Sequence, residues 1–580
     1  MNRFRVWAPS ARTVDVEVSG RSIAMEPVSG GWWTVEVEDA GAGTDYAYAL
    51  DGTAALPDPR SPWQPDGVHA PSRVVDHAAF SWSDRGWSAP PLSSGVVYEL
   101  HVGTFSPEGT FDGAIDRLDH LVDLGVTHVE LMPVAAFPGR WGWGYDGVAL
   151  WAPDESYGGP DGLKRLVDAC HGRGLAVLLD VVYNHLGPDG NHLGRFGPYF
   201  TDRYVTPWGD AVNLDGPGSD EVRRFFFDNA RMWLRDYHLD GLRVDAVHSI
   251  VDTSARHFLE ELADEVFALE PELGRHLVLL AENDRNDPRV AMPREVGGSG
   301  FTAQWNEDFH HALHALLTGE REGYYADFGS ITDVADCLEH GLVYDGKYSN
   351  FRGRRHGRSA RGVPGDRSVG CAQNHDQVGN RARGERLSHL VSEGRVRIAA
   401  ALVLTAPFVP MLFQGEEWGA STSFCYFTDH SDAELAASVR EGRRREFAAF
   451  GWDPDDIPDP QDGETFERSR LRWDEREEPW HAEMVAWYAA LIRLRRSTPD
   501  LLDGDPGSTR VRHDETEGWL VVERGSVAVV CNLGHRNHRV PFAHPEDLRV
   551  LSSWGGGPRT VEGAVEVSAE SVAILQTGNG

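Results

Sequence analysis

The stretch HLVLLAENDRNDPR, His276 to Arg289, changes character halfway along its length. Its first half is a short apolar run, typical of a buried strand, and this run ends on a carboxylate, Glu282. Its second half is a burst of Asn, Asp and Arg residues. A strand in a protein core has no use for a glutamate at its end, whereas an active site does. Whether other strands of the chain end in the same way therefore decides the fold.

Strands and amphipathic helices alternate through the middle of the chain. The helix expected after the first of these strands places Ile115, Leu118, Leu121 and Val122 on one face. Strand–helix alternation repeated about eight times predicts a (β/α)8 TIM barrel. A doubly wound open sheet is the alternative, but no strand is followed by a GxGxxG-type turn. The eight expected strands lie within 95–100, 127–134, 176–185, 241–248, 276–283, 301–310, 368–376 and 408–417.

The two ends of the chain differ in pattern from its middle. They consist of short runs in which apolar and polar residues alternate, separated by Gly, Ser and Pro. We expect a multidomain protein of α/β and all-β parts: an N-terminal β-sandwich over 1–90, the barrel over 91–500 and a C-terminal β-sandwich over 505–580. Within the barrel, 186–217 is a short insertion over its mouth, and 425–473 is an acidic, partly helical insertion.

Charge and cysteine content restrict the partners and the compartment. A net charge of -35 disfavours nucleic acid and anionic membranes, which would repel the chain, but it does not disfavour a neutral sugar. The five cysteines are scattered without CxxC spacing, which indicates free thiols in a reducing compartment. The N-terminus shows no signal segment, so we expect a soluble, cytoplasmic protein. No feature of the sequence indicates the oligomeric state.

Three carboxylates from three strand ends are the candidates for catalysis. Catalytic side chains of a barrel project from the carboxyl ends of its strands, and Asp245, Glu282 and Asp376 lie at such ends. Asp245 follows Arg243 by two residues, so both point to one side, and the guanidinium would keep Asp245 ionised as a nucleophile. An apolar strand would raise the pKa of Glu282 toward that of a general acid. Asp376 remains to hold sugar hydroxyls. This set predicts glycoside hydrolysis with retention, with the carboxyl groups of the pair about 5–5.5 Å apart.

Further polar and aromatic residues follow the same strand ends and one loop, and each has a structural alternative. A lone Asp is more often a helix N-cap, a lone His can be a packing residue, and a Gly-flanked aromatic loop can be just that. Their coincidence at one face favours a substrate site. The candidates for substrate binding are Trp141, Trp143, Tyr145, Asp146, His185, Arg243, His248, Asn283, Asp284, Asn374 and His375.

Four motifs, DVVYNH, GLRVDAVH, the AEN glutamate and QNHD, resemble in order the conserved regions of the α-amylase superfamily, glycoside hydrolase family 13. The resemblance covers about residues 96 to 500, and the flanking β domains are similar to those found in that superfamily. It implies Asp245 as nucleophile, Glu282 as acid/base and Asp376 as the transition-state carboxylate. It also implies that Arg243, His185, His375 and Tyr145 surround the sugar ring under attack.

The spacer motifs narrow the expectation within the superfamily. AENDRNDPR, YDGKYSNFRGRRHG, QNHDQVGNRARGERL and LFQGEEWGASTSFCYFTDH are similar to those of members that release trehalose from the end of a maltooligosyl chain. The resemblance then places the loop Asn283 to Arg289 toward the trehalose leaving group, with Asp284 as the best candidate to bind it. Capping of the turn, or pairing of Asp284 and Asp287 with Arg285 and Arg289, is the structural alternative.

Two functional alternatives remain open. A glycogen branching or debranching enzyme shares the N-terminal sandwich and the three carboxylates. A non-catalytic glucan-binding protein is disfavoured, because a binding module needs no acid/base pair. Asn184 matches a position that helps to bind calcium in many α-amylases, but the segment after it lacks a cluster of oxygen ligands, so we expect no metal and no other cofactor.

Overall fold

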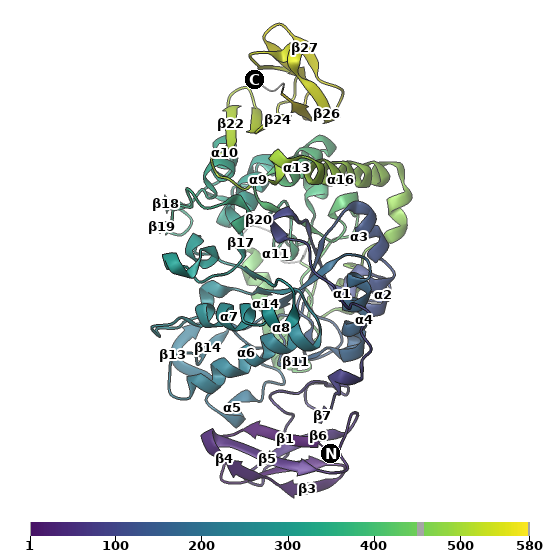
Figure 1. Cartoon of the computed structure of the whole chain (residues 1–580). Helices are drawn as coiled ribbons and strands as arrows, with labels where there is room; N and C mark the ends of the chain where they lie inside the picture. Colours follow the sequence, from purple (N-terminus) through teal and green to yellow (C-terminus); the bar gives the residue numbers. More distant parts are fainter. Residues whose placement is uncertain (1, 449–456, 578–580) are drawn as a thin grey trace.

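The computed structural model describes residues 2–448 and 457–577 of the chain, and its centre is a closed barrel of eight parallel strands (Figure 1). Each segment expected to hold a barrel strand contains one, which confirms the predicted TIM barrel. In order around the barrel, the strands are β12 (Ala176–Val181), β15 (Gly241–Val244), β16 (Val278–Ala281), β17 (Ala303–Trp305), β20 (Ser368–Cys371), β21 (Val409–Phe413), β8 (Val97–Leu100) and β9 (His128–Leu131).

Helices follow the barrel strands and cover their outer faces. In α4, Leu163, Leu166 and Val167 are buried against the barrel while Asp161 and Arg165 are exposed, the pattern of a helix with one apolar face. The main helices are α3 (Leu118–Leu124), α4 (Gly159–His171), α6 (Ser219–Asp236), α7 (Phe258–Phe267), α9 (Glu307–Thr318), α10 (Ile331–His340), α13 (Glu393–Thr405) and α16 (Pro479–Ser497).

The register of the strands brings the candidate carboxylates to one level at the carboxyl ends. Asp180 on β12 is paired with Arg243 on β15. The backbone ladder continues just beyond the strands, where the N–H of Asp245 donates to the carbonyl of Val181 and the N–H of Glu282 donates to that of Val244. Asp245 and Glu282 therefore leave two adjacent strands at neighbouring positions.

Antiparallel sheets flank the barrel at opposite ends of the molecule (Figure 1). The N-terminal part has one sheet of β1 (Asn2–Trp7), β5 (Trp32–Val37) and β4 (Glu26–Val28), and another of β3 (Arg21–Ala24), β2 (Val14–Val18), β6 (Asp45–Leu50) and β7 (Ser72–Arg73). The C-terminal part has a sheet of β22 (Thr509–Asp514), β23 (Trp519–Arg524), β24 (Val527–Asn532), β29 (Ser571–Gln576) and β26 (Arg549–Trp554), and another of β25 (His538–Pro541), β28 (Ala564–Val567) and β27 (Arg559–Val561). The limits of the three domains given above stay a proposal.

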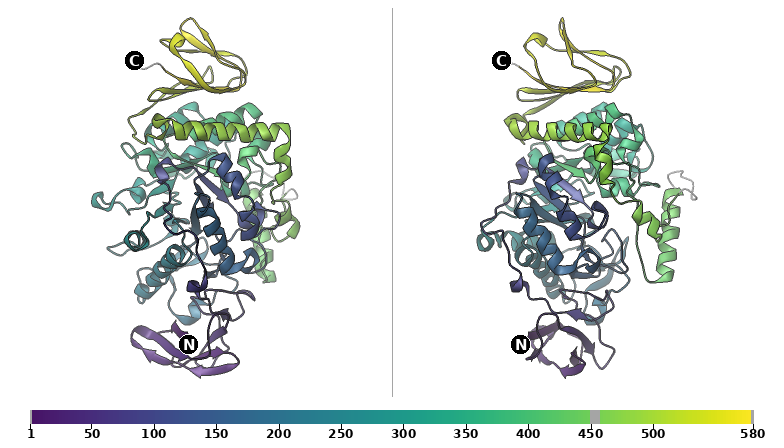
Figure 2. Two further views of the ribbon diagram at one scale, coloured as in Figure 1. Left: turned by 45° about the vertical axis from the view of Figure 1, so that its right-hand side comes forward. Right: turned by 90° about the vertical axis from the view of Figure 1, so that its right-hand side faces the viewer.

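Three β hairpins and the helix α14 lie outside the ring of barrel strands. The segment 186–217 carries β13 (Phe200–Thr206) and β14 (Gly209–Val212), and two further pairs are β10 (Ala135–Ala136) with β11 (Ala149–Pro153) and β18 (Asp345–Ser349) with β19 (Arg354–Gly357). The segment 425–473 carries α14 (Ala433–Ala448), which stands at the side of the barrel (Figure 2). Residues 449–456 of this expected insertion, and residues 578–580 of the expected C-terminal domain, lie outside the described residues.

All five cysteines are buried and unpaired. Among the described residues, no helix has both the length and the apolar character that crossing a membrane requires.

Two buried arginines meet at the carboxyl end of α13, and one of them, Arg524, connects the C-terminal sheets to the barrel. Arg524, at the end of β23, donates from Nη1 to the carbonyls of Thr405 at 3.0 Å, Ala406 at 2.8 Å and Leu501 at 3.0 Å. Arg495, near the end of α16, also donates to the Ala406 carbonyl, at 2.8 Å. The last carbonyls of a helix have no partner within that helix, so the two guanidinium groups satisfy the carboxyl end of α13.

We predict that Arg524→Met lowers the free energy of unfolding by about 2–4 kcal/mol, because it leaves several buried carbonyl oxygens without a donor. The measurement is the midpoint of thermal or urea unfolding. Arg510→Met, which replaces an exposed arginine of the same sheet, is the matched control and should change stability by less than about 0.5 kcal/mol. Equal effects of the two substitutions would contradict the anchoring role of Arg524.

Candidate active site

A single buried guanidinium gathers the carboxylates at the barrel mouth. The side chain of Arg243 has no exposed surface, and its Nη1 donates to Asp180 Oδ2 at 2.6 Å and to Asp245 Oδ1 at 2.9 Å. Its Nη2 donates to Glu282 Oε2 at 2.8 Å. The ring of Trp305 lies 4.1 Å from the guanidinium carbon and supports it by a cation–π contact. The structure thus places Asp245 and Glu282, predicted as nucleophile and acid, on one cation.

The backbone between the strands adds a second link within this group. Ala246, just after Asp245, has φ 40° and ψ 50°, a left-handed conformation that costs a residue with a side chain on the order of 1–2 kcal/mol. This turn aims the N–H of Ala246 at Glu282 Oε2, 2.9 Å away. The hydrogen bond that this strained turn allows therefore helps to hold the carboxyl of Glu282 in place.

Asn184 fixes the other side of Asp245. Its Nδ2 donates to Asp245 Oδ2 at 2.6 Å and to the Asp245 carbonyl at 3.0 Å, while its Oδ1 lies 2.6 Å from His185 Nδ1. Asn184, the position noted above for calcium, is thus engaged with side chains of the site. Burial lowers the pKa of His185 to about 4.

Burial and charge act in opposite directions on the two central carboxyls. Burial raises the pKa of Asp245 from its ordinary value, and Arg243 opposes this shift. The arginine therefore favours the ionised form, as expected from the sequence, but the net direction is upward because burial outweighs it. Burial also raises the pKa of Glu282; Arg243 opposes this shift, whereas Asp245 adds to it. Both carboxyls accept hydrogen bonds from the same guanidinium, so the charge of one acts on the pKa of the other.

His375, Asp376 and Tyr145 form the opposite wall. Nε2 of His375 lies 3.5 Å from Asp376 Oδ1. The ring of Tyr145 stacks on that of His375 at a centroid distance of 5.1 Å, and its hydroxyl donates to Asp180 Oδ2 at 2.6 Å. Burial raises the pKa of Asp376, and His375 opposes this shift. Glu282 also raises the pKa of Asp376, so the charges of these two carboxyls affect each other.

The two tryptophans of the aromatic loop are held by packing. Trp143 is buried, donates from Nε1 to the carbonyl of Cys425 at 2.9 Å and stacks on Phe424. Trp141 is half-buried and stacks on Phe466 at 5.8 Å. Trp143 also meets the edge of the His375 ring at 5.4 Å, so this tryptophan supports the wall of the site from behind.

The loop after Glu282 leads toward a neighbouring hairpin. The carboxylate of Asp284 accepts from both terminal nitrogens of Arg352, which lies in the turn between β18 and β19. The N–H of Asp284 donates to His248 Nδ1 at 3.2 Å. Asp287, by contrast, pairs with Arg289, as the structural alternative expected. Asp284 is thus turned away from its own loop.

Three further candidates make contacts within the loops. Asn283 donates to Gln304 Oε1 at 3.0 Å, which holds the start of its loop. Asn374 is the N-cap of the short helix α11 (His375–Gly379), where its side chain accepts from the N–H of Gln377 at 2.9 Å. Asp146 lies 3.8 Å from His430 Nε2. These contacts position the loops that surround the site, and the binding roles of all three residues stay predictions.

Several residues of this site carry no role in the sequence-based prediction. Asp180 is the first residue of the motif DVVYNH, but its place on Arg243 depends on the register of the barrel. Glu307 begins α9 directly after β17, and burial, Glu282 and Asp284 raise its pKa well above the usual range. A charged residue two positions after Trp305 in the sixth expected strand is the signal that could have revealed it.

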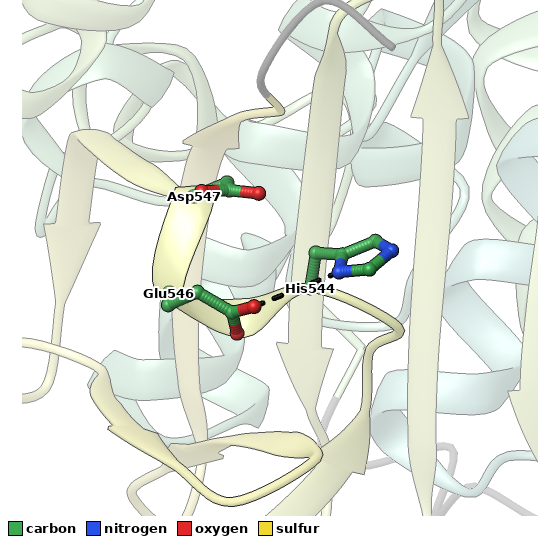
Figure 3. Close-up of side chains that lie close together, drawn as sticks. All are labelled: His544, Glu546 and Asp547. Atoms are coloured by element: carbon green, nitrogen blue, oxygen red, sulfur yellow. Dashed lines mark ion pairs between the residues drawn. The ribbon is translucent and has the colours of Figure 1, made fainter.

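One group of three neighbouring side chains among the described residues offers the ligand types that a metal would need. It consists of His544, Glu546 and Asp547, whose candidate ligand atoms lie within 4.8 Å of one another (Figure 3). All three are exposed and belong to the C-terminal part, outside the barrel, so this group supplies nothing to the candidate active site.

Known proteins are similar to this chain in both sequence and fold. Residues 71–195 match the family model of the alpha amylase catalytic domain. A malto-oligosyltrehalose trehalohydrolase of Mycobacterium tuberculosis is 48% identical over 582 residues, covering 99% of each chain. Another from Rhizobium sp. (strain M-11) is 51% identical over 543 residues, covering 92% of this chain and 91% of its own. A crystal structure of an alpha amylase candidate from Salmonella typhimurium is 38% identical and superimposes with a TM-score of 0.90, over 99% of this chain and 97% of that one.

Identity near one half along the whole length exceeds what a shared fold alone requires, and the four motifs at the strand ends lie where an α-amylase-type barrel needs them. The chain belongs to the malto-oligosyltrehalose trehalohydrolase family, within the α-amylase superfamily of glycoside hydrolases.

Proposed function

We propose that this protein hydrolyses the α-1,4-glucosidic bond next to the terminal trehalose of a maltooligosyltrehalose and releases trehalose. The observation that carries the chemistry is the placement of Asp245 and Glu282 on one shared buried guanidinium, that of Arg243. The names of the full-length relatives support the identity of the bond that is cut. The alternative of a branching or debranching enzyme has less support, because the trehalohydrolases match this chain along nearly its whole length.

Asp245 and Glu282 are the residues proposed to make and break the bonds. Asp245 attacks the anomeric carbon while Glu282 gives its proton to the leaving oxygen of trehalose, which leaves a glycosyl–Asp245 intermediate. Glu282, now ionised, takes a proton from water, which attacks the anomeric carbon and frees Asp245. The two carboxyls contact different terminal nitrogens of the same guanidinium, which supports a close pair. A separation of about 5–5.5 Å is what a retaining mechanism requires, against about 6.5–9.5 Å for inverting enzymes.

The contacts of the two carboxyls support this division of roles. Asp245 accepts from Arg243 and from Asn184, and both donors stabilise its ionised, nucleophilic form. Burial and the neighbouring charge of Asp245 both raise the pKa of Glu282, which favours the protonated form that an acid needs. When Asp245 is consumed in the intermediate, its charge disappears, and the pKa of Glu282 falls as its role changes to base.

The remaining wall is proposed to hold the sugar ring that is attacked. Asp376, His375, Tyr145 and His185 present polar atoms around the carboxyl pair, and hydrogen bonds to ring hydroxyls there strengthen in the transition state. Trp208, in the turn of the β13–β14 hairpin, stacks flat on His185 at 4.3 Å and is about half exposed. It extends the apolar surface of this wall outward.

The pair of Asp284 and Arg352 is proposed to act on the leaving-group side. The catalytic carboxyls treat a trehalose and a maltose leaving group alike, so discrimination needs groups beyond the cut. Asp284 follows the proposed acid by two positions, remains about one-third exposed and is held by Arg352. A charge-assisted pair of this kind offers fixed acceptors and donors to sugar hydroxyls.

A cytoplasmic location is part of the proposal. It is supported by the five buried, unpaired thiols, which are typical of a reducing compartment.

Product analysis tests the proposed reaction. With maltotriosyltrehalose as substrate, we expect trehalose and maltotriose, and the new reducing end of maltotriose should first appear as the α-anomer, because two displacements at carbon 1 retain configuration. Proton NMR within the first minutes of reaction measures both. Maltopentaose is the control and should be cleaved far more slowly. Early β-anomer would contradict the glycosyl–Asp245 intermediate, and equal cleavage of maltopentaose would contradict the trehalose specificity.

Glu282→Gln tests whether Glu282 is the general acid and Asp245 the nucleophile. It should lower kcat/KM for maltotriosyltrehalose by two orders of magnitude or more, since no proton reaches the leaving oxygen. With α-maltotriosyl fluoride the loss should be much smaller, because fluoride leaves without a proton from Glu282. Asp245→Ala is the comparison and should lose activity on both substrates. A Glu282→Gln enzyme with near-normal rates on maltotriosyltrehalose would show that another residue is the acid.

Asp284→Ala tests whether Asp284 binds the trehalose leaving group. We expect kcat/KM for maltotriosyltrehalose to fall by roughly tenfold or more, since a site built to bind a hydroxyl loses that contact. Cleavage of maltopentaose should change little. Asp287→Ala, in the same loop but paired with Arg289, is the matched control and should leave the ratio of the two substrates unchanged. Equal losses on both substrates for Asp284→Ala would mean that Asp284 supports the catalytic group instead.

A further inference from the structure

A buried carboxylate from the first barrel strand contacts the imidazole of His375. Glu99 lies in β8, and its side chain is 1% exposed. Its Oε2 accepts from the backbone N–H of His375 at 2.9 Å, and its Oε1 lies 2.5 Å from His375 Nδ1. One carboxylate thus fixes both the backbone and the ring of this histidine.

The two ring nitrogens of His375 both face carboxylate oxygens. Nδ1 faces Glu99 Oε1, and Nε2 faces Asp376 Oδ1 at 3.5 Å. An ionised carboxylate only accepts hydrogen bonds, so a favourable contact on each side requires a hydrogen on each nitrogen. Tyr145 stacked on one face of the ring, and Trp143 at its edge, prevent a flip that would exchange the two nitrogens.

We propose that Glu99 is a positioning residue for the reaction: by holding Nδ1 it keeps His375 a doubly protonated imidazolium whose Nε2–H points at Asp376 and the sugar. The inference rests on the proposed roles of His375 and Asp376. Glu99 itself touches neither substrate nor the reacting carbon, so its effect passes through the histidine.

The ionisable groups around His375 come from four strands of the barrel and from its own helix. Burial lowers the pKa of His375, but Glu99 on β8 and Asp376 on α11 raise it, with Arg243 on β15 acting against them, and the net value is about 9. Glu130 on β9 and Asp180 on β12 also interact with the imidazole. His101, just after β8, interacts with it as well. With an ordinary histidine pKa of 6.5, loss of the Glu99 charge would leave burial dominant.

The imidazolium also determines the charge of Asp376. Burial raises the pKa of Asp376, and the first group that opposes this is His375. Deprotonation of His375 would therefore remove a donor to the sugar and, at the same time, favour protonation of Asp376. Both changes weaken the hydrogen bonds that tighten in the transition state, so activity should fall as His375 loses its proton.

The neighbouring strand offers a matched control for Glu99. Glu130 on β9 is the direct register partner of Glu99 on β8, and both are buried inside the barrel. Neither carboxyl oxygen of Glu130 has a hydrogen-bond partner within residues 2–448 and 457–577, and burial raises its pKa well above the usual range. Glu130 is therefore a neutral acid, and Glu130→Gln changes no charge, whereas Glu99→Gln removes one.

The experiment measures kcat/KM against pH for the wild type, Glu99→Gln and Glu130→Gln with α-maltotriosyl fluoride. Fluoride needs no proton from Glu282, so the basic limb reports His375 and not the general acid. In the wild type the limb should lie near pH 9. In Glu99→Gln it should move down by about two units or more, so that activity at pH 8 falls roughly tenfold or more below that at pH 6. Glu130→Gln should keep the wild-type limb.

Each outcome bears on the inference. A wild-type limb near pH 6.5 would overturn it without any variant, which keeps it testable if Glu99→Gln fails to fold. An unshifted limb in a folded Glu99→Gln enzyme, or equal shifts in both variants, would also overturn it. Asp376→Asn separates the two levels of proposal: near-normal hydrolysis by this variant would reject the role of Asp376, whereas a large loss together with an unshifted Glu99→Gln limb would reject only the role of Glu99.

Discussion

The candidate active site depends on one buried guanidinium. Arg243 has no exposed surface and binds Asp180, Asp245 and Glu282 at 2.6–2.9 Å. Taking a cation out of water is costly, and only several carboxylate partners with good geometry compensate for it. The arginine therefore requires the carboxylates as much as they require it. Replacing Arg243 would leave uncompensated buried charges, so the arrangement is either kept whole or lost.

The barrel provides the rigidity that this charge group needs. Asp180 and Arg243 are register partners on adjacent strands, and Asp245 and Glu282 continue two neighbouring strands by one residue. Hydrogen bonds of the sheet thus determine the separation of the two backbone positions from which these carboxyls project. The strained turn at Ala246 adds the final orientation of Glu282. Charged groups held at strand ends are already in place before the reaction, so they need little reorganisation as charge develops in the transition state. This preorganisation is the main source of electrostatic catalysis.

The sequence predicts the parts of this molecule that depend on local pattern. Apolar runs that end in Asp or Glu predict the barrel and its carboxyl-end residues, and the two-residue period of a strand places Arg243 beside Asp245. Contacts that depend on the closure of the barrel are not contained in any local pattern. The pairing of Asp284 with Arg352, rather than with Arg285, joins segments 68 residues apart. Glu99 stands within an apolar strand, not at its end, so no rule based on strand ends identifies it; its contact with His375 joins the first barrel strand to the seventh.

The distribution of protons at the barrel mouth follows from a shortage of cations. Carboxyl groups outnumber the two buried cations, Arg243 and His375, around which they gather. Carboxyls in contact with a cation, Asp245 and Glu99, accept several hydrogen bonds as ionised groups do. Glu130 and Glu307 contact no cation within the part of the chain that the structure describes, and burial raises the pKa of each well above the usual range. Glu282 is intermediate, since it shares Arg243 with Asp245 and is destabilised as an anion by that neighbour. In the proposed mechanism, a carboxyl in this position would hold its proton while Asp245 is charged and release it when the charge of Asp245 is consumed, which is the sequence of events that a retaining hydrolase requires.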